Sequence, residues 1–349
     1  MIAYLPYVMT SKEKEIKNVI ENSERVVLIH HIDADGICSA ALWCLWLKNN
    51  KNIFPFIFSP KYGEIREHLV NAILSVRPDC ILILDIPRDN VDDLEEIIKI
   101  LVDHHRIPKS EKKLISFVDL NKCTTTLSFD LLSSWDEKFE KYAWIAAIGS
   151  LGDKDYENYN RFKEITARYY DIKEEDFKKM MCIISSSRIF NEKGAKVAIN
   201  SLVEAACIDM PSAIFGKTQN SRMLLRYWKV GQKLINIYIK QSGKMEKYED
   251  KKVIFYELES KYGIQNYVAS VLARQFQDYF IFVINKGFHW KYAYLEARTR
   301  REDKDLGKLL EDITKRLEEG KGGGHKNAAG ARFVKEDLSK FKELVLSSI

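Results

Sequence analysis

The sequence lacks the cysteine pairs on which disulfide-rich and zinc-binding proteins depend. Its six cysteines are scattered along the chain, and no two of them form a C-x-x-C pair. Isolated thiols of this kind are typical of reduced, mostly buried residues in a cytosolic protein. We therefore expect a cytoplasmic location, and we expect neither a disulfide framework nor a zinc framework.

Long apolar runs are also missing. No segment approaches the roughly 20 consecutive apolar residues that a membrane span requires. The opening stretch, MIAYLPYVMTSKEKEIK, lacks the basic, apolar and small-residue regions of a signal peptide. We expect no membrane partner, and we find no internal repeat or low-complexity tract.

The composition is that of a globular protein with a sizeable core: 46% of the 349 residues are hydrophobic and 30% are charged. This length fits two domains better than one. The formal net charge of +5 is compatible with an anionic partner without requiring one.

Short runs of β-forming residues alternate with helical patterns in the first half of the chain. We predict strands at 25–30, 52–58, 80–86, 100–105 and 114–119. We predict helices at 36–48, where nearly every face is apolar, and at 63–76 and 91–99. Continuous apolar strands separated by helices indicate a parallel sheet covered on both faces, whose sites lie at the carboxyl ends of the strands.

The rest of the chain divides into a helical middle and a second α/β region. The pattern from about 126 to 247 is mostly helical, with a long segment near 221–244. The end predicts strands at 252–259, 279–286 and 290–298 and helices at 264–277, 305–318 and 335–347. The expected fold class is α/β. Residues 1–190 would form a catalytic domain, 191–245 a helical connector and 246–349 a smaller α/β domain.

The segment HIDADG directly follows the first predicted strand. In extended backbone His31, Asp33 and Asp35 point the same way, because side chains alternate between the two sides. His30 would face the opposite side and is expected to be structural. Two carboxylates this close repel each other unless a cation lies between them. The segment therefore predicts a metal site, although one aspartate could simply be a helix N-cap.

Other predicted strands end in the same kinds of residue. Asp85 ends the third strand, Asp103, His104 and His105 end the fourth, and Asp153 follows an apolar segment and a glycine-containing turn. A parallel sheet would bring such strand ends together. Carboxylates and imidazoles without a thiolate suit Mn²⁺ or Mg²⁺ better than Zn²⁺ or Fe²⁺.

Two further segments leave alternatives open. Thr124, Thr125 and Thr126 precede a helical stretch and could cap that helix or bind a phosphate. The segment GKGGGHKNAAG at 320–330 could be a flexible loop, or its backbone amides could approach a bound anion.

Together these motifs resemble those of the DHH phosphoesterase superfamily. HIDADG, the isolated Asp85, the DHH triplet at 103–105 and GSLGD at 149–153 resemble its four motifs, and GKGGGHKNAAG resembles the signature of its DHHA1 domain. The nearest groups are the archaeal RecJ-like and the nanoRNase/pAp-phosphatase proteins. The C-terminal signature argues against family II pyrophosphatases.

The resemblance implies a centre of two divalent cations, Mn²⁺ foremost and Mg²⁺ as the alternative. One cation would be held by His31, Asp33 and Asp85, and the other by Asp35, Asp85, His104 and Asp153. Asp85 would bridge the two ions, which would activate a hydroxide for attack on phosphorus. Asp103 would orient the imidazoles, with direct ligation as the alternative, and His105 would contact the scissile phosphate.

The resemblance also places substrate binding in the second domain. The residues concerned are Arg298, Gly322, Gly323, Gly324 and His325. Relatives often have a serine two residues before that arginine, whereas this chain has Glu296. This departure puts the phosphate contacts of the second domain in question.

The resemblance implies a hydrolase, foremost a single-strand-specific exonuclease of the RecJ type. It would hydrolyse DNA, RNA or short oligonucleotides to mononucleotides. One alternative is a pAp phosphatase or cyclic-dinucleotide phosphodiesterase. Another is a scaffold of a replication complex with little activity, and an active enzyme could also dock on replication proteins.

Overall fold

The structure is a computed structural model that describes residues 9–60, 67–86, 94, 96–105 and 113–349. The chain divides into two compact units, Met1–Trp228 and Lys229–Ile349. No helix in the described part of the chain is long and apolar enough to cross a membrane.

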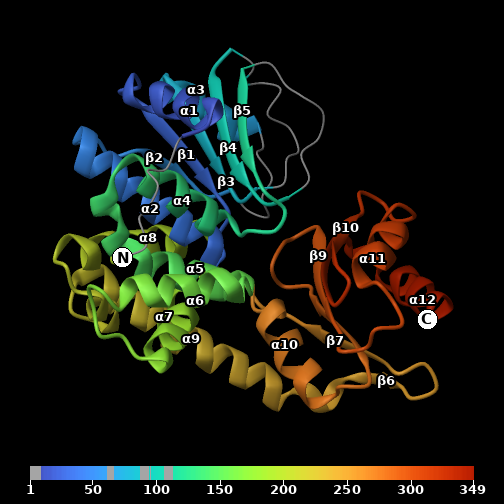
Figure 1. Cartoon of the computed structure of the whole chain (residues 1–349). Coiled ribbons are helices and arrows are strands. Elements are labelled where there is room, and N and C mark those ends of the chain that lie inside the picture. The colour runs from blue at the N-terminus through green and yellow to red at the C-terminus, as the bar shows by residue number, and fades with distance from the viewer. Residues whose placement is uncertain (1–8, 61–66, 87–93, 95, 106–112) are drawn as a thin grey trace. The chain divides into compact units, whose positions relative to one another are not determined.

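The first unit is built on a parallel sheet of five strands in the order β2-β1-β3-β4-β5 (Figure 1). The strands are β1 (Val26–His30), β2 (Phe56–Phe58), β3 (Cys80–Leu84), β4 (Ile98–Asp103) and β5 (Leu114–Val118). Every neighbouring pair in this sheet is parallel. The predicted parallel sheet is therefore confirmed. The helix predicted at 91–99 lies mostly outside the described residues, and it is wrong at its end, because β4 already begins at Ile98.

Helices cover both faces of this sheet, as predicted. Val26 and Leu28 of β1 pack into a large core with α1 (Ser11–Glu21) and α2 (Ala34–Lys51). Val27 and Ile29 point the other way and pack with residues of α3 (Glu67–Val76). The alternation along β1 is what a buried strand requires, since both of its faces meet apolar side chains.

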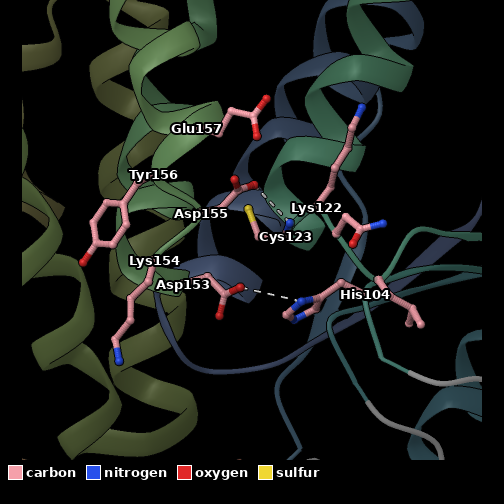
Figure 2. Close-up of a pocket in the computed structure, with 10 residues that line it drawn as sticks. His104, Lys122, Cys123, Asp153, Lys154, Asp155, Tyr156 and Glu157 are labelled. Carbon is pink, nitrogen blue, oxygen red and sulfur yellow. Dashed lines mark hydrogen bonds and ion pairs between the residues drawn. The ribbon is translucent and has the colours of Figure 1, made fainter.

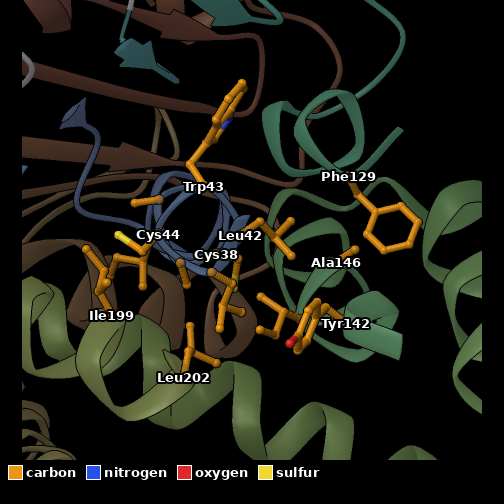
Figure 3. Close-up of a cluster of buried hydrophobic side chains, with 14 of the residues drawn as sticks. Cys38, Leu42, Trp43, Cys44, Phe129, Tyr142, Ala146, Ile199 and Leu202 are labelled. Carbon is orange, nitrogen blue, oxygen red and sulfur yellow. The ribbon is translucent and has the colours of Figure 1, made fainter. Parts of the chain in front are cut away.

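Helix α2 is the centre of the larger core. Fourteen of its 18 residues are buried. Figure 3 shows its side chains meeting others from α4 (Thr124–Trp135), α5 (Ala143–Asp153) and α8 (Asn191–Cys207). Trp43 donates its indole N–H to Ser128 Oγ at 3.2 Å. A helix that is apolar all round must be buried, and each large side chain hidden here contributes roughly 1.5–3 kcal/mol.

The remaining helices of the first unit are α6 (Tyr156–Thr166) and α7 (Glu174–Ser186). Helix α9 (Gln219–Lys240) continues across the boundary between the two units. Residues of α8 belong to the large core of the first unit. The expected division into 1–190, 191–245 and 246–349 stays a prediction.

The second unit contains a mixed sheet of six strands in the order β10-β11-β9-β8-β7-β6. The strands are β6 (Glu246–Tyr248), β7 (Val253–Leu258), β8 (Phe280–Asn285), β9 (Tyr292–Arg298), β10 (Lys321–His325) and β11 (Ala328–Val334). Its helices are α10 (Gln265–Gln275), α11 (Leu306–Thr314) and α12 (Leu338–Ser348). Phe255, Phe282 and Phe341 form part of its core. The predicted smaller α/β domain is confirmed as a fold.

The flexible-loop alternative for the glycine-rich segment is wrong, and so is the turn that was expected before Asp153. The glycine-rich segment is a hairpin rather than a loop, since β10 pairs with β11 and Gly323 lies opposite Gly330. Glycine is disfavoured in strands, but the backbone of β10 pairs with β11 along its whole length. Residues 143–153 form the single helix α5, so Asp153 does not follow a turn.

Candidate metal centre

The register of the sheet aligns the ends of three strands. His30 lies beside Leu84, and Leu84 lies beside Val102. The backbone N–H of Asp85 donates to the carbonyl of Val102 at 3.2 Å. The residues that follow β1 and β3 therefore meet the end of β4 at one edge, as the parallel sheet requires.

The HIDADG segment turns from strand into helix within four residues. β1 ends at His30, and α2 begins at Ala34 with Asp33 as its N-cap, whose carboxylate accepts the Gly36 N–H at 3.1 Å. The expectation that Asp35 projects from extended backbone is therefore wrong, because Asp35 reaches the site from the first turn of α2. Asp33 therefore caps the helix, and because it also faces His31, capping does not exclude its predicted role as a metal ligand.

His30 points into the protein. It is fully buried, and burial lowers its pKa to about 4. Its Nδ1–H donates to the carbonyl of His31 at 2.6 Å, and Ser59 lies 2.7 Å from Nε2 and donates its hydroxyl proton there. A neutral imidazole held in this way has a structural role, in agreement with the expectation for this residue.

A first group of possible ligands consists of His31, Asp33 and Asp85. Their ligand atoms all lie within 4.8 Å of one another. His31 Nδ1 is 2.8 Å from Asp33 Oδ2 and 3.5 Å from Asp85 Oδ2. The three residues therefore surround a volume suited to one cation.

A second group consists of Asp35, His104 and Asp153, again within 4.8 Å. His104 Nδ1 lies 3.6 Å from Asp153 Oδ2, and His104 Nε2 lies 3.9 Å from Asp35 Oδ2 and 3.3 Å from Asp85 Oδ1. Asp85 thus directs Oδ2 to the first group and Oδ1 to the second. The structure brings together all six residues that the sequence proposed as metal ligands.

Asp85 shows two features that its neighbours in the fold do not explain. Its backbone has a φ of 58°, a left-handed conformation that is unusual for aspartate. Its side chain is buried at 2% exposure, and Oδ2 accepts no hydrogen bond from the described residues. A buried carboxylate oxygen without a donor is costly unless a cation neutralises it. The donor set and this oxygen fit a divalent cation.

The electrostatics of the cluster support the same interpretation. Burial raises the pKa of Asp35 well above its usual range, and the charges of Asp85 and Asp153 raise it further. Burial also raises the pKa of Asp153, to about 6. These carboxyl groups repel one another in a desolvated site, and bound cations would remove that repulsion.

The pKa values of two histidines of the cluster are raised as well, which keeps these imidazoles protonated and positively charged. Burial alone would lower the pKa of His31, but the charge and the hydrogen bond of Asp33 outweigh it and raise that pKa to about 10. Burial of His104 is likewise outweighed by Asp85 and Asp35, which raise its pKa to about 10. Protons on these two imidazoles therefore place positive charge beside the carboxylates of the cluster.

The N-terminus of α4 holds Asp35 in place. The backbone N–H groups of Thr124 and Thr125 donate to the two Asp35 oxygens at 2.9 and 2.7 Å, and Thr125 Oγ1 donates to the Asp35 carbonyl at 2.8 Å. Cys123 is the N-cap residue and forms no side-chain cap. The threonines therefore do not cap α4, and the amides of Thr124 and Thr125 are not open to a phosphate. A run of threonines at a helix start was the only sequence signal for this role.

Glycines place Asp153 at the end of α5. A Cβ atom on Gly149 would lie 2.2 Å from Thr125 Oγ1, and one on Gly152 would lie 2.5 Å from the Ala34 Cβ. Both positions therefore need glycine for α5 to pack this closely against α4 and α2. The sequence pattern indicated a turn at these glycines and carried no signal of their packing role.

Asp103 and His105 form a closely linked pair beside the cluster. Asp103 Oδ1 accepts hydrogen bonds from the backbone N–H of His104 at 2.7 Å, the backbone N–H of His105 at 3.1 Å and His105 Nδ1 at 2.7 Å. Those bonds suit an orienting group. The ligand atoms of both residues also lie within 4.8 Å of those of Asp85 and His104, so direct ligation by Asp103 stays open.

A cavity of about 300 Å³ adjoins the second ligand group (Figure 2). His104 and Asp153 line its inner side. The other lining residues are Leu120, Asn121, Lys122, Cys123, Lys154, Asp155, Tyr156 and Glu157. Tyr156 is 58% exposed. The lining carries two lysines and three carboxylates. No sequence motif pointed to this cavity.

The residues expected to bind substrate form a separate group within the second unit. Arg298 at the end of β9 lies in register with Ala328, which pairs with His325 of the glycine hairpin. Gly324 has a φ of 137°, which only glycine adopts readily. Gly322 and Gly323 precede it in β10.

Glu296 engages the expected phosphate-binding arginine. Arg298 Nη1 lies 3.1 Å from Glu296 Oε2, and Arg298 also donates to the side-chain oxygen of Asn266. The arginine is therefore already paired with a carboxylate.

Comparisons with known proteins agree with this architecture. The family model described as the DHH family, N-terminal domain, matches residues 25–150, and that of the DHHA1 domain matches residues 250–349. A sequence comparison with curated proteins gives no significant match.

Solved structures share the fold at low sequence identity. A crystal structure of the exonuclease RecJ bound to manganese superposes with a TM-score of 0.72 at 18% identity, covering 98% of this chain and 94% of that one. RecJ from Thermus thermophilus in complex with Mn²⁺ gives 0.74 at 17%, covering 99% of this chain and 56% of the other. The DHH domain of a protein described as a member of a ribosomal protein family gives 0.68 at 15%, covering 98% and 92%.

Proposed function

This chain belongs to the DHH/DHHA1 superfamily, and on that premise we propose that it is a phosphodiesterase that depends on two divalent cations. The proposed substrates are single-stranded DNA, single-stranded RNA or short oligonucleotides, which it would shorten from an end to mononucleotides. Mn²⁺ is the proposed cation, with Mg²⁺ as the alternative. An active enzyme of this kind could also dock on replication proteins.

One observation carries the proposal. The buried Asp85 carboxylate faces two ligand groups at once, with Oδ2 3.5 Å from His31 and Oδ1 3.3 Å from His104. A structural aspartate would have both of its oxygens hydrogen-bonded, whereas Oδ2 accepts no hydrogen bond from the described residues. A carboxylate shared between two groups of oxygen and nitrogen ligands suits a pair of cations that lie close together.

The chain provides a set of ligands for each of the two cations. His31, Asp33 and Asp85 would hold one, and Asp35, Asp85, His104 and Asp153 the other. Cations bound there would polarise the oxygens of a phosphodiester and lower the pKa of a water molecule. Asp35 is anchored by the N-terminus of α4, so the protein orients this ligand before any cation arrives.

His105 and Asp103 are proposed to assist at the scissile phosphate. The hydrogen bond from His105 Nδ1 to Asp103 fixes the imidazole plane and leaves Nε2 for the substrate. Hydrolysis breaks the P–O bond to the departing nucleotide, and the departing oxygen then needs a proton. In its protonated form His105 would carry that proton on Nε2 while Nδ1–H donates to Asp103, and transfer to the departing oxygen would leave a neutral imidazole.

The cavity beside His104 and Asp153 is the proposed place for a nucleotide next to the reacting phosphate. Lys154 carries charge that favours a phosphate group, Lys122 is paired with Asp130 at 3.0 Å, and the exposed ring of Tyr156 offers a surface for a base. The lining also contains the carboxylates of Asp153, Asp155 and Glu157, whose charge bound cations would offset. A polar lining with an aromatic ring suits a nucleotide better than a purely apolar molecule.

The test is a time course on end-labelled single-stranded DNA and RNA with Mn²⁺, with Mg²⁺ and with chelator. We expect stepwise shortening with metal and none with chelator or in Asp85→Asn. An enzyme for small molecules would hydrolyse pAp or a cyclic dinucleotide and ignore the long strand. A scaffold would bind the strand without shortening it under any condition. Equal cleavage with and without chelator would refute the metal-dependent mechanism.

A further inference from the structure

Helix α9 carries an unusual concentration of positive charge. Its 22 residues include Arg222, Arg226, Lys229, Lys233 and Lys240 and no acidic residue. The chain as a whole has a formal net charge of +5, from 55 basic and 50 acidic residues. The net charge of α9 therefore equals that of the whole protein, and elsewhere 50 basic residues balance 50 acidic ones.

The five basic side chains lie on one face of the helix. At 3.6 residues per turn their spacing places them within an arc of roughly 60°, over a length of about 27 Å. All five are exposed. The opposite face is apolar and buried, with Leu224 at 0% and Ile235 at 7% exposure. We call these five residues the basic stripe, and α9 can be followed in Figure 1 by its yellow to gold colour.

Other helices of this protein arrange their charges differently. Lys17 pairs with Glu21 at 3.8 Å, Lys178 with Glu174 at 3.1 Å, and Lys315 with Glu311 at 2.7 Å. Each lysine has an acidic partner one turn away. In the part of the chain that the structure describes, no residue forms an ion pair with any member of the basic stripe.

The stripe is unfavourable for an isolated helix. Arg222 and Arg226 are four residues apart, as are Lys229 and Lys233, and Arg226 and Lys229 are three apart. Like charges at these spacings face each other and destabilise a helix. An anionic partner that lies along the helix would convert this repulsion into attraction.

The structure assigns the basic stripe as a track for the phosphate backbone of a single-stranded nucleic acid. The assignment rests on the proposed function and adds where the strand lies away from the scissile bond. A row of cations about 27 Å long is enough for four or more nucleotides. Met223, Val230 and Ile237 form an exposed apolar row beside the stripe, where sugars and bases can pack.

A membrane surface fits this helix less well. Helices that lie in a membrane interface bury a broad apolar face in the lipid. The broad apolar face of α9 is already used, because Leu224 and Trp228 pack with the core of the first unit. Only a narrow row of three apolar side chains stays exposed, so electrostatic attraction would contribute most of the binding free energy. Binding of that kind suits a polyanion.

The test compares two triple variants that remove the same charge. One is Arg226→Gln, Lys229→Gln and Lys233→Gln in the stripe. The matched control is Lys17→Gln, Lys178→Gln and Lys315→Gln, which removes three lysines that have acidic partners. Circular dichroism and thermal unfolding establish that both variants are folded.

Binding of a labelled single strand of about 20 nucleotides, longer than the stripe, is measured by fluorescence anisotropy in chelator over a series of salt concentrations. DNA and RNA of one sequence are both used. We expect the stripe variant to bind at least about tenfold more weakly and to lose about 2 from the slope of log K against log salt, because three phosphate contacts are gone. The control should retain the wild-type slope.

Hydrolysis with Mn²⁺ separates failure of this inference from failure of the proposed function. We expect the ratio of kcat/KM for the long strand to that for a dinucleotide to fall about tenfold in the stripe variant. If wild type shortens the strand while the stripe variant keeps its affinity, slope and ratio, the inference is wrong and the proposed function stands.

If wild type neither binds nor shortens single strands, both proposals are wrong. Binding of wild type and the stripe variant to vesicles of phosphatidylserine and phosphatidylcholine is measured as the last experiment. Loss of vesicle binding in the stripe variant, with strand binding intact, would also overturn the assignment.

Discussion

The backbone N–H of Thr125 donates to Asp35 Oδ1 at 2.7 Å, although the two residues are 90 positions apart in the sequence. Thr125 lies in the first turn of α4 and Asp35 in the first turn of α2. The partial positive charge at the start of α4 thus favours the ionised form of Asp35, a group whose pKa burial and the charges of Asp85 and Asp153 raise well above its usual range. This contact between helices therefore sets the position of one residue of the candidate metal centre.

Enlarging Gly149 should disturb this contact. In Gly149→Ala the new Cβ would lie 2.2 Å from Thr125 Oγ1, so α4 and α5 must move apart. We expect a loss of about 1–3 kcal/mol in the free energy of unfolding, and weaker Mn²⁺ binding by isothermal titration calorimetry.

Gly243→Ala is the matched control, because nothing lies within 4 Å of its added Cβ. Where the added Cβ meets no clash, replacing glycine by alanine stabilises a helix by about 1 kcal/mol, so the control should not be less stable than wild type. A Gly149→Ala variant that is as stable as wild type and binds Mn²⁺ equally well would show that the close packing is unimportant.

Asp85→Asn should abolish stabilisation by metal. Asparagine tolerates the left-handed backbone at φ 58°, so this substitution removes the charge without adding backbone strain. Wild type at a free Mn²⁺ concentration of 100 times Kd should gain about 2.7 kcal/mol in the free energy of unfolding. The variant should gain almost nothing in thermal unfolding with and without Mn²⁺.

Asp209→Asn serves as the control for Asp85→Asn. Asp209 is a carboxylate outside the cluster that bonds to Tyr170 and Lys141. It should leave the Mn²⁺-induced shift in Tm unchanged. The assignment of Asp85 as a shared ligand would be untenable if Asp85→Asn also kept the full shift.

Metal binding should release protons. The pKa values of His31 and His104 are raised to about 10, so both imidazoles are protonated at pH 8 in the metal-free protein, whereas a cation needs them neutral. We expect Mn²⁺ affinity to rise with pH up to about 10. Calorimetry in buffers of different ionisation enthalpy gives the number of protons released. No dependence on the buffer would contradict the charge state of the cluster.

The same groups set the pH dependence of stability without metal. For His31 and His104, a folded pKa above the ordinary 6.5 gives stability that is fully present below about pH 6.5 and lost as pH rises towards 10. Asp153, raised from 3.8 to about 6, adds stability that is lost as pH rises through that interval. The Tm of the chelated protein should therefore fall between pH 6 and 10, and the gap to the Mn²⁺-loaded protein should widen.

Asp103→Asn should separate orientation from ligation. The amide can still accept one of the hydrogen bonds that reach Asp103 Oδ1, but it holds the His105 imidazole less well. We expect kcat to fall about 10–100-fold with little change in Mn²⁺ affinity. A large drop in Mn²⁺ affinity would identify Asp103 as a direct ligand.

Glu296→Gln should strengthen phosphate binding in the second unit. Glu296 lies 3.1 Å from Arg298 and competes with any phosphate for that arginine. Glu296→Gln breaks this partly exposed ion pair and makes Arg298 available to a phosphate. KM for a substrate with a terminal phosphate should therefore fall by about twofold to fivefold. The same substrate without the phosphate is the control, and equal effects on both would rule out competition at Arg298.

Much of the metal centre was predictable because its residues follow strands. The apolar runs that end in Asp85 and in the triplet at 103–105 indicated buried parallel strands, and parallel strands place their carboxyl ends at one edge. The apolar composition of α2 likewise required burial on every side. The glycine hairpin was missed, because the low strand propensity of glycine argues against a strand, and only the backbone pairing with β11 reveals one.

The sequence by itself determined the identity and order of the candidate metal ligands, the parallel sheet that collects them and the charge of α9. These features follow from local patterns in the sequence, namely the spacing of apolar residues, the residues that follow each strand and the residue types themselves. Only the tertiary structure decided that Asp35 is held by the amides of α4, that Asp153 arrives on a helix and that Arg298 is paired with Glu296. Such contacts depend on how closely helices and strands pack, and close packing is set by distances between segments that no local pattern records.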